Sequence, residues 1–415
     1  MRIGLLTQWY DPEPGPAALP GALARGLAER GHQVEVLTGF PNYPDGQLAP
    51  GYRIRARQVE VDGGVRVTRV ALYPSHDASP VRRLANYGSF AMSAAMLGIP
   101  GAFRRLDALW VNYSPVSLAL PMLAQRALRR TPALVHVLDL WPDTLTATGF
   151  GGGDGLAGRS ALRVADAACR AMYRYAERVA YISPGVGAVL AERGVPADRL
   201  AYAPMWADEA LFAPRPAPYP RPYDLPEDHV VLVYAGTLGR AQGLDGLIRA
   251  CAAVTDLPMT CLIAGSGVEE ERLRELAVGA GAANVRFLGR LPASEMTGLM
   301  AAADASYVSL NDDPLAAITM PSKVQAILAS GRALVASVPG DAAQVVGDSG
   351  AGWVVAPGDV SGLARALREM GACGRGGLEV RGRNARAYYE QHFSRARGID
   401  RIEGLLRAVA SEGSR

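Results

Sequence analysis

The chain has 415 residues, of which 49% are hydrophobic and 20% are charged. This length is typical of two domains, and the apolar fraction excludes a disordered chain. The net charge of +3 is too small to indicate a nucleic-acid-binding protein. The four cysteines contain no Cys-x-x-Cys pair. This excludes a disulfide scaffold and a zinc ribbon, and it favours a reducing cytoplasm.

Strands and helices alternate through the first half of the chain. Apolar strands are predicted at residues 2–7, 33–37, 106–111, 133–138 and 179–182, with helices at about 19–28, 117–128 and 187–193. Leu19, Leu23 and Leu27 recur at helical spacing, and Gly31 is a natural stop for that helix. The strand–helix–strand order with short connections predicts a parallel sheet.

A proline-rich segment at 214–226 predicts a stiff linker, after which the alternation starts again. The second set of strands is predicted at 230–234, 259–264, 285–288, 305–310, 333–338 and 353–356. We therefore expect an α/β protein with two doubly wound, Rossmann-like sheets, divided into domains at 1–205 and 206–394. A C-terminal helix at about 395–415 is expected to pack back on the first domain. Ligands of such sheets bind at the carboxyl ends of the strands, which predicts a cleft between the domains.

Two segments offer groups that bind phosphate. Gly236 and Gly239 lie in a turn that follows a predicted strand, with Arg240 beside them. The turn is either a phosphate site or an ordinary strand-to-helix connection. Ser322 and Lys323 open a later helix, either as phosphate ligands or as a capping serine with a surface lysine. Lys323 is the single lysine among 43 basic residues, which favours the phosphate ligand.

Other polar positions are less specific. Asp139 follows a buried strand and is either a base or hydroxyl ligand at the cleft, or a turn residue. His136 is expected to lie in the core. Asp312 and Asp313 precede a proline, which favours a solvated turn over a metal site. No P-loop, dinucleotide-binding or Gly-x-Ser-x-Gly motif is present.

Membrane association depends on one apolar segment. No stretch reaches the roughly 18–20 apolar residues of a transmembrane helix, and the chain begins directly with a strand, unlike a signal peptide. Residues 1–205 nevertheless hold 22 arginines against 16 acidic residues, a net charge of +6. Arginines flank the apolar residues 84–99, which form either a buried helix or, slightly less favoured, a contact with an anionic membrane. The protein is thus expected in the cytoplasm, with peripheral contact at the inner membrane surface as the open alternative.

Several segments together resemble the family 4 retaining glycosyltransferases of the GT-B fold. Within that family they are similar to the O-antigen and colanic-acid fucosyl and N-acetylfucosaminyl transferases. The matching segments, in family order, are 31–44, 114–118, 139–143, 182–185, 206–212, 239–243 and 321–325.

The resemblance implies a metal-independent hexosyltransferase without a cofactor. A UDP-sugar donor would bind the second domain, and a lipid-linked saccharide or a small natural-product acceptor would bind the first. The implied catalytic residues are Asp139, Arg240 and Lys323. The implied donor-binding residues are Gly15, Gly236, Thr237, Gly239, Gln242, Arg290, Leu291, Ser322 and Gln325, and the implied acceptor-binding residues are Asn42, Tyr43 and Trp141.

The sequence departs from the family pattern at the donor site. Many members carry two glutamates where this chain has Ile318 and Ala326, and the second of them usually holds the ribose, so Gln325 is the substitute implied here. Thr237 and Gln242 replace a generic Arg and Lys. The missing glutamates keep a non-catalytic nucleotide-sugar-binding protein open as an alternative. A GT-B epimerase acting on UDP-N-acetylglucosamine is a further alternative, although the matching segments point away from that group.

Overall fold

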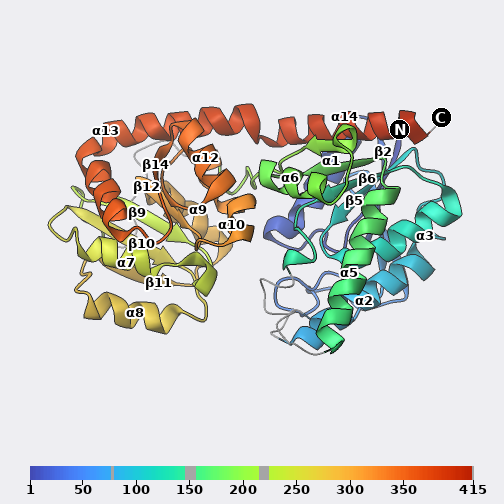
Figure 1. Ribbon diagram of the computed structural model, residues 1–415, viewed down its shortest axis with the longest axis horizontal. Helices are drawn as coiled ribbons and strands as arrows, with labels where there is room; N and C mark the ends of the chain where they lie inside the picture. Colours follow the sequence, from blue (N-terminus) through green and yellow to red (C-terminus); the bar gives the residue numbers. More distant parts are fainter. Residues whose placement is uncertain (76–78, 145–155, 215–223, 414–415) are drawn as a thin grey trace. The chain divides into compact units, whose positions relative to one another are not determined.

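The computed structural model describes residues 1–75, 79–144, 156–214 and 224–413, and the chain divides into two compact units. The first unit is Met1–Met205 together with Gly398–Arg415, and the second is Trp206–Arg397 (Figure 1). Most of the predicted linker at 214–226 lies outside the described residues. Each unit contains one largely parallel sheet, as the strand–helix alternation predicts.

The sheet of the first unit has the strand order β3-β4-β2-β1-β5-β6-β7-β8. The strands are β1 (Arg2–Leu6), β2 (Gln33–Gly39), β3 (Arg57–Asp62), β4 (Val65–Val70), β5 (Ala108–Tyr113), β6 (Ala133–Val137), β7 (Arg178–Tyr181) and β8 (Leu200–Tyr202). Every residue of β5 and β6 is buried, as in a parallel sheet covered on both faces. β3, β4 and β8 were not predicted. β3 is an edge strand that pairs antiparallel with β4 and has no buried residue, so it lacks an apolar signal.

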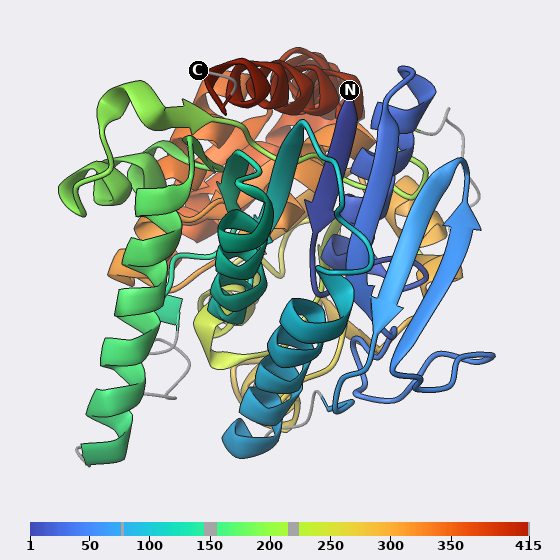
Figure 2. The same ribbon diagram turned by 90° about the vertical axis from the view of Figure 1, so that its right-hand side faces the viewer.

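Helices cover both faces of this sheet. They are α1 (Leu19–Glu29), α2 (Pro80–Ser93), α3 (Ala119–Arg129), α5 (Leu156–Tyr175) and α6 (Pro184–Glu192), with short turns η1 (Gly15–Ala18), η3 (Val116–Leu118) and η4 (Ala197–Arg199). α2 continues into a π-helical turn, η2 (Ala94–Gly98). Figure 2 shows α2, α3 and α5 side by side, and α3 packs against both of the others. Within the described ranges, no helix is both long and apolar enough to cross a bilayer.

The sheet of the second unit is entirely parallel and has the order β11-β10-β9-β12-β13-β14. Its strands are β9 (Val230–Ala235), β10 (Met259–Ala264), β11 (Val285–Gly289), β12 (Ala305–Ser309), β13 (Ala333–Ser337) and β14 (Gly352–Val355). Its helices are η5 (Arg240–Gln242), α7 (Asp245–Ala252), α8 (Glu270–Gly279), α9 (Ala293–Ala302), α10 (Pro314–Ile318), α11 (Ser322–Ser330), α12 (Gly340–Ser349) and α13 (Val360–His392).

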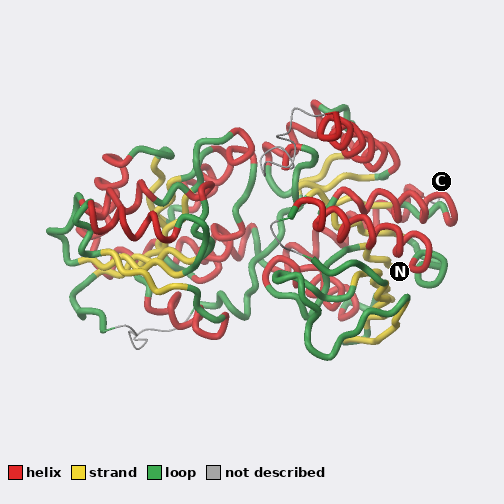
Figure 3. The backbone as a smooth tube through the Cα atoms, turned by 90° about the horizontal axis from the view of Figure 1, so that it is seen from below, coloured by secondary structure: helices red, strands yellow, loops and turns green. Residues whose placement is uncertain are grey.

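Alternate strand residues of this unit face two separate hydrophobic cores. Leu232 and Tyr234 of β9 pack with α7, α8 and the start of α13, whereas Val231 and Val233 pack with α9, α11 and α12. Helices therefore flank both faces of the sheet, as Figure 3 shows. This doubly wound arrangement leaves the carboxyl ends of the strands as the place where loops from both layers meet.

The last helix, α14 (Arg395–Gly413), belongs to the first unit from Gly398 onward. Its Glu403 accepts a hydrogen bond from Arg30 Nη1 at 2.7 Å, and Glu403 Oε1 lies 3.0 Å from Nε2 of the buried His32. The bond with His32, together with those from Arg407 and Arg30, lowers the pKa of Glu403 to about 2. Glu403 thus fastens α14 to the segment between α1 and β2.

We predict that Glu403→Ala lowers the free energy of unfolding by about 2 kcal/mol at pH 7, because a hydrogen-bonded carboxylate is lost. Asp400→Ala on the same helix is the control. Asp400 pairs with Arg30 at 2.6 Å but is 58% exposed, so its loss should cost about 0.5 kcal/mol or less. Since the pKa of Glu403 is lowered, the difference should fade as the pH falls from about 4.5 towards 2. Thermal unfolding measures both variants, and equal costs would contradict the assignment.

Candidate functional site

Three glycines lie next to one another at the carboxyl edge of the second sheet. Gly236 follows β9, Gly265 follows β10, and Gly289 ends β11. Gly236 N donates to Ala264 O at 2.9 Å, and Gly265 N donates to Gly289 O at 2.7 Å. Arg290 follows Gly289 directly, so the turn after β9 and the residues predicted to bind the base lie on the same edge.

Two of these glycines have no room for a side chain. A Cβ atom on Gly265 would lie 1.8 Å from Gly236 O, and one on Gly236 would lie 2.3 Å from Lys323 Nζ. Both residues have φ of +146°, which side chains also disfavour. The two loops therefore pack closely at the place where the Lys323 ammonium lies. Gly265 was not singled out in the sequence analysis.

Lys323 occupies the second position of α11, in the layer opposite the ring of Tyr234. Its Nζ donates a hydrogen bond of 2.8 Å to Tyr234 Oη and lies 4.2 Å from the centroid of that ring. No acidic side chain among the described residues forms an ion pair with it. Burial lowers the pKa of Lys323 to about 8. A partly buried cation without a carboxylate is typical of a site that binds an anion.

Hydrogen bonds hold the backbone of the turn after β9, whereas the side chain of Arg240 in that turn is exposed. Gln242 Oε1 accepts from Gly239 N at 3.2 Å, and Ser309 Oγ donates to Gln242 O at 2.6 Å. The side chain of Arg240 is 88% exposed, and its Nε lies 3.3 Å from Glu269 Oε1. The backbone of the turn is therefore fixed, while the guanidinium of Arg240 extends into solvent.

The other predicted donor residues lie on the same loops with different exposure. Thr237, Arg290 and Ser322 are exposed, and Leu291 is half-buried. Gln325 is only 5% exposed, on the face of α11 that packs on the sheet. The half-buried Ala326, where the family usually has a glutamate, packs against the core formed with α9, α11 and α12.

A second group of polar residues lies at the carboxyl edge of the first sheet. Asp139 comes two residues after β6 and is exposed. Its Oδ2 accepts a hydrogen bond of 2.5 Å from Ser114 Oγ, and Ser114 directly follows β5. The orientation of the carboxylate is thus set by the neighbouring strand. As expected, the buried His136 lies in the core, where its ring bonds to Ala203 O.

Four aromatic side chains form a row near Asp139. Neighbouring ring centroids are 6.2 Å apart from Tyr43 to Trp9, 6.4 Å from Trp9 to Tyr87 and 6.5 Å from Tyr87 to Trp141, all in edge-to-face geometry. We call these four residues the aromatic row. Tyr43 and Trp141 were predicted to bind the acceptor, whereas Trp9 and Tyr87 were not singled out. The place of Trp9 just after the first strand was the signal that could have found it.

The loop that carries Tyr43 is held by a buried carboxylate. Glu13, 3% exposed, accepts hydrogen bonds of 2.8 Å from the backbone N–H groups of Asn42 and Tyr43. Burial raises the pKa of Glu13. The side chain of Asn42 is also buried, and its amide bonds to Asn86 and to the Phe40 carbonyl. Asn42 therefore has internal partners at both ends of its amide.

Two further features belong to the framework. Gly15, predicted at the donor phosphates, begins η1 with φ of +67° and is exposed. Asp313 caps α10, where its side chain accepts from Leu315 N at 2.8 Å. The structure thus gives this aspartate a capping role in a turn, which agrees with the favoured interpretation of Asp312 and Asp313.

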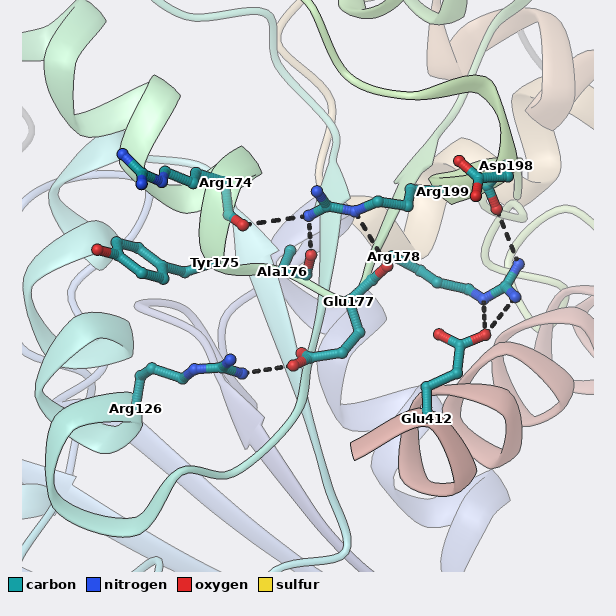
Figure 4. Close-up of a pocket in the computed structure, with 9 residues that line it drawn as sticks. All are labelled: Arg126, Arg174, Tyr175, Ala176, Glu177, Arg178, Asp198, Arg199 and Glu412. Atoms are coloured by element: carbon teal, nitrogen blue, oxygen red, sulfur yellow. Dashed lines mark hydrogen bonds and ion pairs between the residues drawn. The ribbon is translucent and has the colours of Figure 1, made fainter. Parts of the chain in front are cut away.

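Figure 4 shows a hollow of about 340 Å³ in the first unit, at the amino end of β7. Several of its arginines are committed to protein groups. Arg126 pairs with Glu177, Arg178 pairs with Glu412 of α14, and Arg199 donates to main-chain carbonyls at the end of α5. This hollow lies at the end of the sheet opposite Asp139. We assign the residues that line it to holding the helices against the sheet.

Solved structures with the same fold were found by comparison. Sucrose-phosphate synthase from Thermosynechococcus elongatus has a TM-score of 0.71 and 19% identity to this chain, over 99% of both chains. HepE from Anabaena, solved with UDP and glucose, has a TM-score of 0.64 and 18% identity, over 98% of this chain and 99% of that one. WaaG, a glycosyltransferase involved in lipopolysaccharide biosynthesis, has a TM-score of 0.61 and 17% identity, over 96% and 98%. The chain has the GT-B fold, as predicted.

Sequence comparison gives the family. Residues 15–206 match the glycosyl transferase 4-like domain, and residues 229–372 match the glycosyl transferases group 1. WcaI of Escherichia coli K12, named for colanic acid biosynthesis, is 29% identical over 330 residues, which are 78% of this chain and 79% of WcaI. WbjE of Pseudomonas aeruginosa, named a glycosyltransferase, is 25% identical over 318 residues, 74% of this chain and 76% of WbjE. The chain belongs to the family 4, group 1 glycosyltransferases, and it is an enzyme.

Proposed function

We propose that the protein transfers a hexose or amino-hexose from a UDP-sugar to a saccharide acceptor, with retention of configuration and without a metal ion. The acceptor is lipid-linked or a small natural product. The carboxyl edge of the second sheet with Gly236, Gly265 and Gly289 is called the glycine edge. The observation that carries this proposal is the ammonium of Lys323, which lies at the glycine edge without an acidic partner among the described residues. Support for UDP comes from HepE, which was solved with UDP-glucose.

The donor diphosphate is placed between the turn after β9 and the start of α11. Lys323 and the exposed guanidinium of Arg240 offset its charge, in place of a metal ion, while Gly236 and Gly239 let the backbone of the turn lie close to it. Negative charge grows on the leaving diphosphate in the transition state, so these groups stabilise the transition state more than the bound donor. Ser322 adds a hydroxyl.

The nucleoside is placed further along the same edge. We assign the base to backbone groups of Arg290 and Leu291, which follow Gly289 at the end of β11. Ribose is assigned to Gln325, which carries the polar group next to Ala326. Gly15 stays a donor-binding residue that the family resemblance predicts.

The acceptor is placed at the aromatic row and Asp139. Sugar rings present apolar faces to aromatic side chains, and a carboxylate accepts hydrogen bonds from hydroxyls. Tyr43 and Trp141 are proposed to contact the acceptor. Asn42, whose side chain has internal partners, supports the loop of Tyr43. Ser114 orients Asp139, which acts on the acceptor or the transferred sugar. The incoming hydroxyl would attack the face from which the nucleotide leaves.

We also propose that the first unit touches an anionic membrane through α2 and η2. One side of this helix is buried at Phe90, while Val81 and Met96 on other sides are exposed. The helix is therefore half buried, as expected of a core helix on one side, and the exposed side is the one we propose for the membrane. Arg104 and Arg105, which follow η2, are exposed and add positive charge. An exposed apolar strip beside arginines is typical of a peripheral membrane contact.

The alternative of a non-catalytic nucleotide-sugar-binding protein is set aside, because the family matches make the chain an enzyme. The donor is the part of the proposal to test, since Ile318 and Ala326 stand where many members carry glutamates. Release of UDP from a panel of UDP-sugars, with an acceptor present, measures which donor the enzyme turns over.

We expect Lys323→Ala to lower turnover by roughly 10²–10³, the usual cost of removing one preorganised charge partner. Lys323→Arg should be impaired too, because a planar guanidinium does not fit where a compact ammonium does. UDP release is the measurement, and unchanged melting temperatures are the control for folding. Near-normal turnover of Lys323→Ala would remove the diphosphate from this place.

The pH dependence of UDP affinity checks the same assignment. Since the pKa of Lys323 is about 8, the protonated form that attracts the diphosphate prevails below pH 8. Affinity should therefore fall as the pH rises above 8. Lys323→Arg should lack this fall because arginine stays charged.

We expect Asp139→Asn to lower turnover while UDP affinity stays within about twofold of the parent, because Asp139 acts on the acceptor side. Ser114→Ala should lower turnover less, since it removes only the orienting hydrogen bond. Calorimetry with UDP and a turnover assay separate the two effects. An equal loss of UDP affinity in Asp139→Asn would move this residue to the donor.

We expect the protein to co-sediment with anionic vesicles and to be released by salt, because the attraction is electrostatic in part. Val81→Asp and Met96→Asp should weaken the binding. The control is Val268→Asp, which places the same charge at an exposed valine of the second unit. Absent binding at low salt, or equal effects of the three substitutions, would contradict the membrane contact.

A further inference from the structure

The hydroxyl of Tyr234 joins the two elements of the glycine edge. Tyr234 is fully buried in β9. Its Oη donates a hydrogen bond of 2.6 Å to Thr237 O in the turn and accepts one of 2.8 Å from Lys323 Nζ in α11. A carbonyl can only accept and an ammonium can only donate, so both roles of the hydroxyl are fixed.

The path of the Lys323 side chain depends on the same residue. The ring of Tyr234 faces the core on one side of the sheet, whereas α11 packs on the other side. Lys323 therefore reaches across the carboxyl edge of β9 to meet Tyr234. It passes where a Cβ on Gly236 would lie, 2.4 Å from Lys323 Cε. The ammonium then lies over the ring, where the π-electrons also attract it.

We propose that Tyr234 is a positioning residue for the donor site. It holds the Lys323 ammonium in one place and ties it to the turn, so that both elements meet the diphosphate as one preformed unit. This inference rests on the proposed function. Lysine has a long flexible side chain whose ordering costs entropy, and a preformed position removes that cost from binding. Tyr234 is buried and acts through Lys323 and Thr237.

Tyr307 offers a matched control. It lies in the neighbouring strand β12, is 2% exposed, and its ring centroid is 6.5 Å from that of Tyr234. Its hydroxyl bonds to the side chains of Ser309 and Ser337. Tyr307→Phe thus removes a buried hydroxyl from the same core without touching Lys323.

The first measurement needs no ligand. Lys323 is the only lysine, so competitive acetylation followed by peptide mapping gives its pKa directly. The parent should titrate near pH 8, and Tyr234→Phe should titrate at least about half a unit lower, because the ammonium loses its acceptor. Tyr307→Phe should match the parent. A parent-like value in Tyr234→Phe would overturn the proposal.

The second measurement is a double-mutant cycle on UDP affinity by calorimetry. Tyr234→Phe should weaken UDP binding about tenfold in the parent and less than about twofold in Lys323→Ala, because its effect passes through Lys323. Tyr307→Phe should change affinity less than about twofold. Equal losses in both backgrounds would mean a purely structural role and would overturn the proposal.

A second variant tests the proposal in case Tyr234→Phe does not fold. Gly236→Ala keeps the hydroxyl but displaces Lys323, so it should reproduce the loss of UDP affinity, while the pKa of Lys323 should rise towards its ordinary value because the ammonium leaves its buried position. Gly246→Ala in α7 is its control, since a Cβ there meets no atom within 4 Å. If the parent binds no UDP while the acetylation shift appears, the proposed function fails and the positioning of Lys323 by Tyr234 stands.

Discussion

A half-buried ammonium is costly when no carboxylate in the described part of the chain pairs with it, and the second unit is arranged around this constraint. The cost shows in the lowered pKa of Lys323. Gly236 leaves the space that the lysine side chain occupies, Gly265 lets the next loop approach, and the Tyr234 hydroxyl accepts a hydrogen bond from the ammonium. A bound anion would offset the cost, which explains why such strict packing surrounds a single charge.

The first unit separates its candidate site from its fastening contacts. Ser114, Asp139, Trp9, Tyr43 and Trp141 follow the carboxyl ends of β1, β2, β5 and β6, and α2 contributes Tyr87 to the aromatic row. The opposite end of the sheet carries ion pairs such as Arg178 with Glu412, which hold α14 in place. A parallel sheet makes this division possible, because all loops that leave its strands in the same direction meet at one edge.

The strength of the local signal decides which elements the sequence reveals. β10 was predicted at residues 259–264 and is observed there, because a fully apolar strand is easily recognised. β3 was missed because its residues are exposed at a sheet edge. Lys323 stood out by composition, whereas Tyr234 did not, since an aromatic residue in an apolar strand is normally a core residue. Its hydroxyl becomes important only through partners that lie 3 and 89 positions along the chain.

The sequence alone determined the two parallel sheets, the glycine turn, the resemblance to family 4 glycosyltransferases and Lys323 as the cation of interest. These follow from periodicity, turn residues and composition, which are local properties of the chain. Tertiary structure alone decided that Lys323 crosses the edge of β9 to Tyr234, that Trp9 and Tyr87 complete the aromatic row, and that Asn42 turns inward to its own partners. Such pairings join residues far apart in the chain, and only the packing of helices on sheets brings them together.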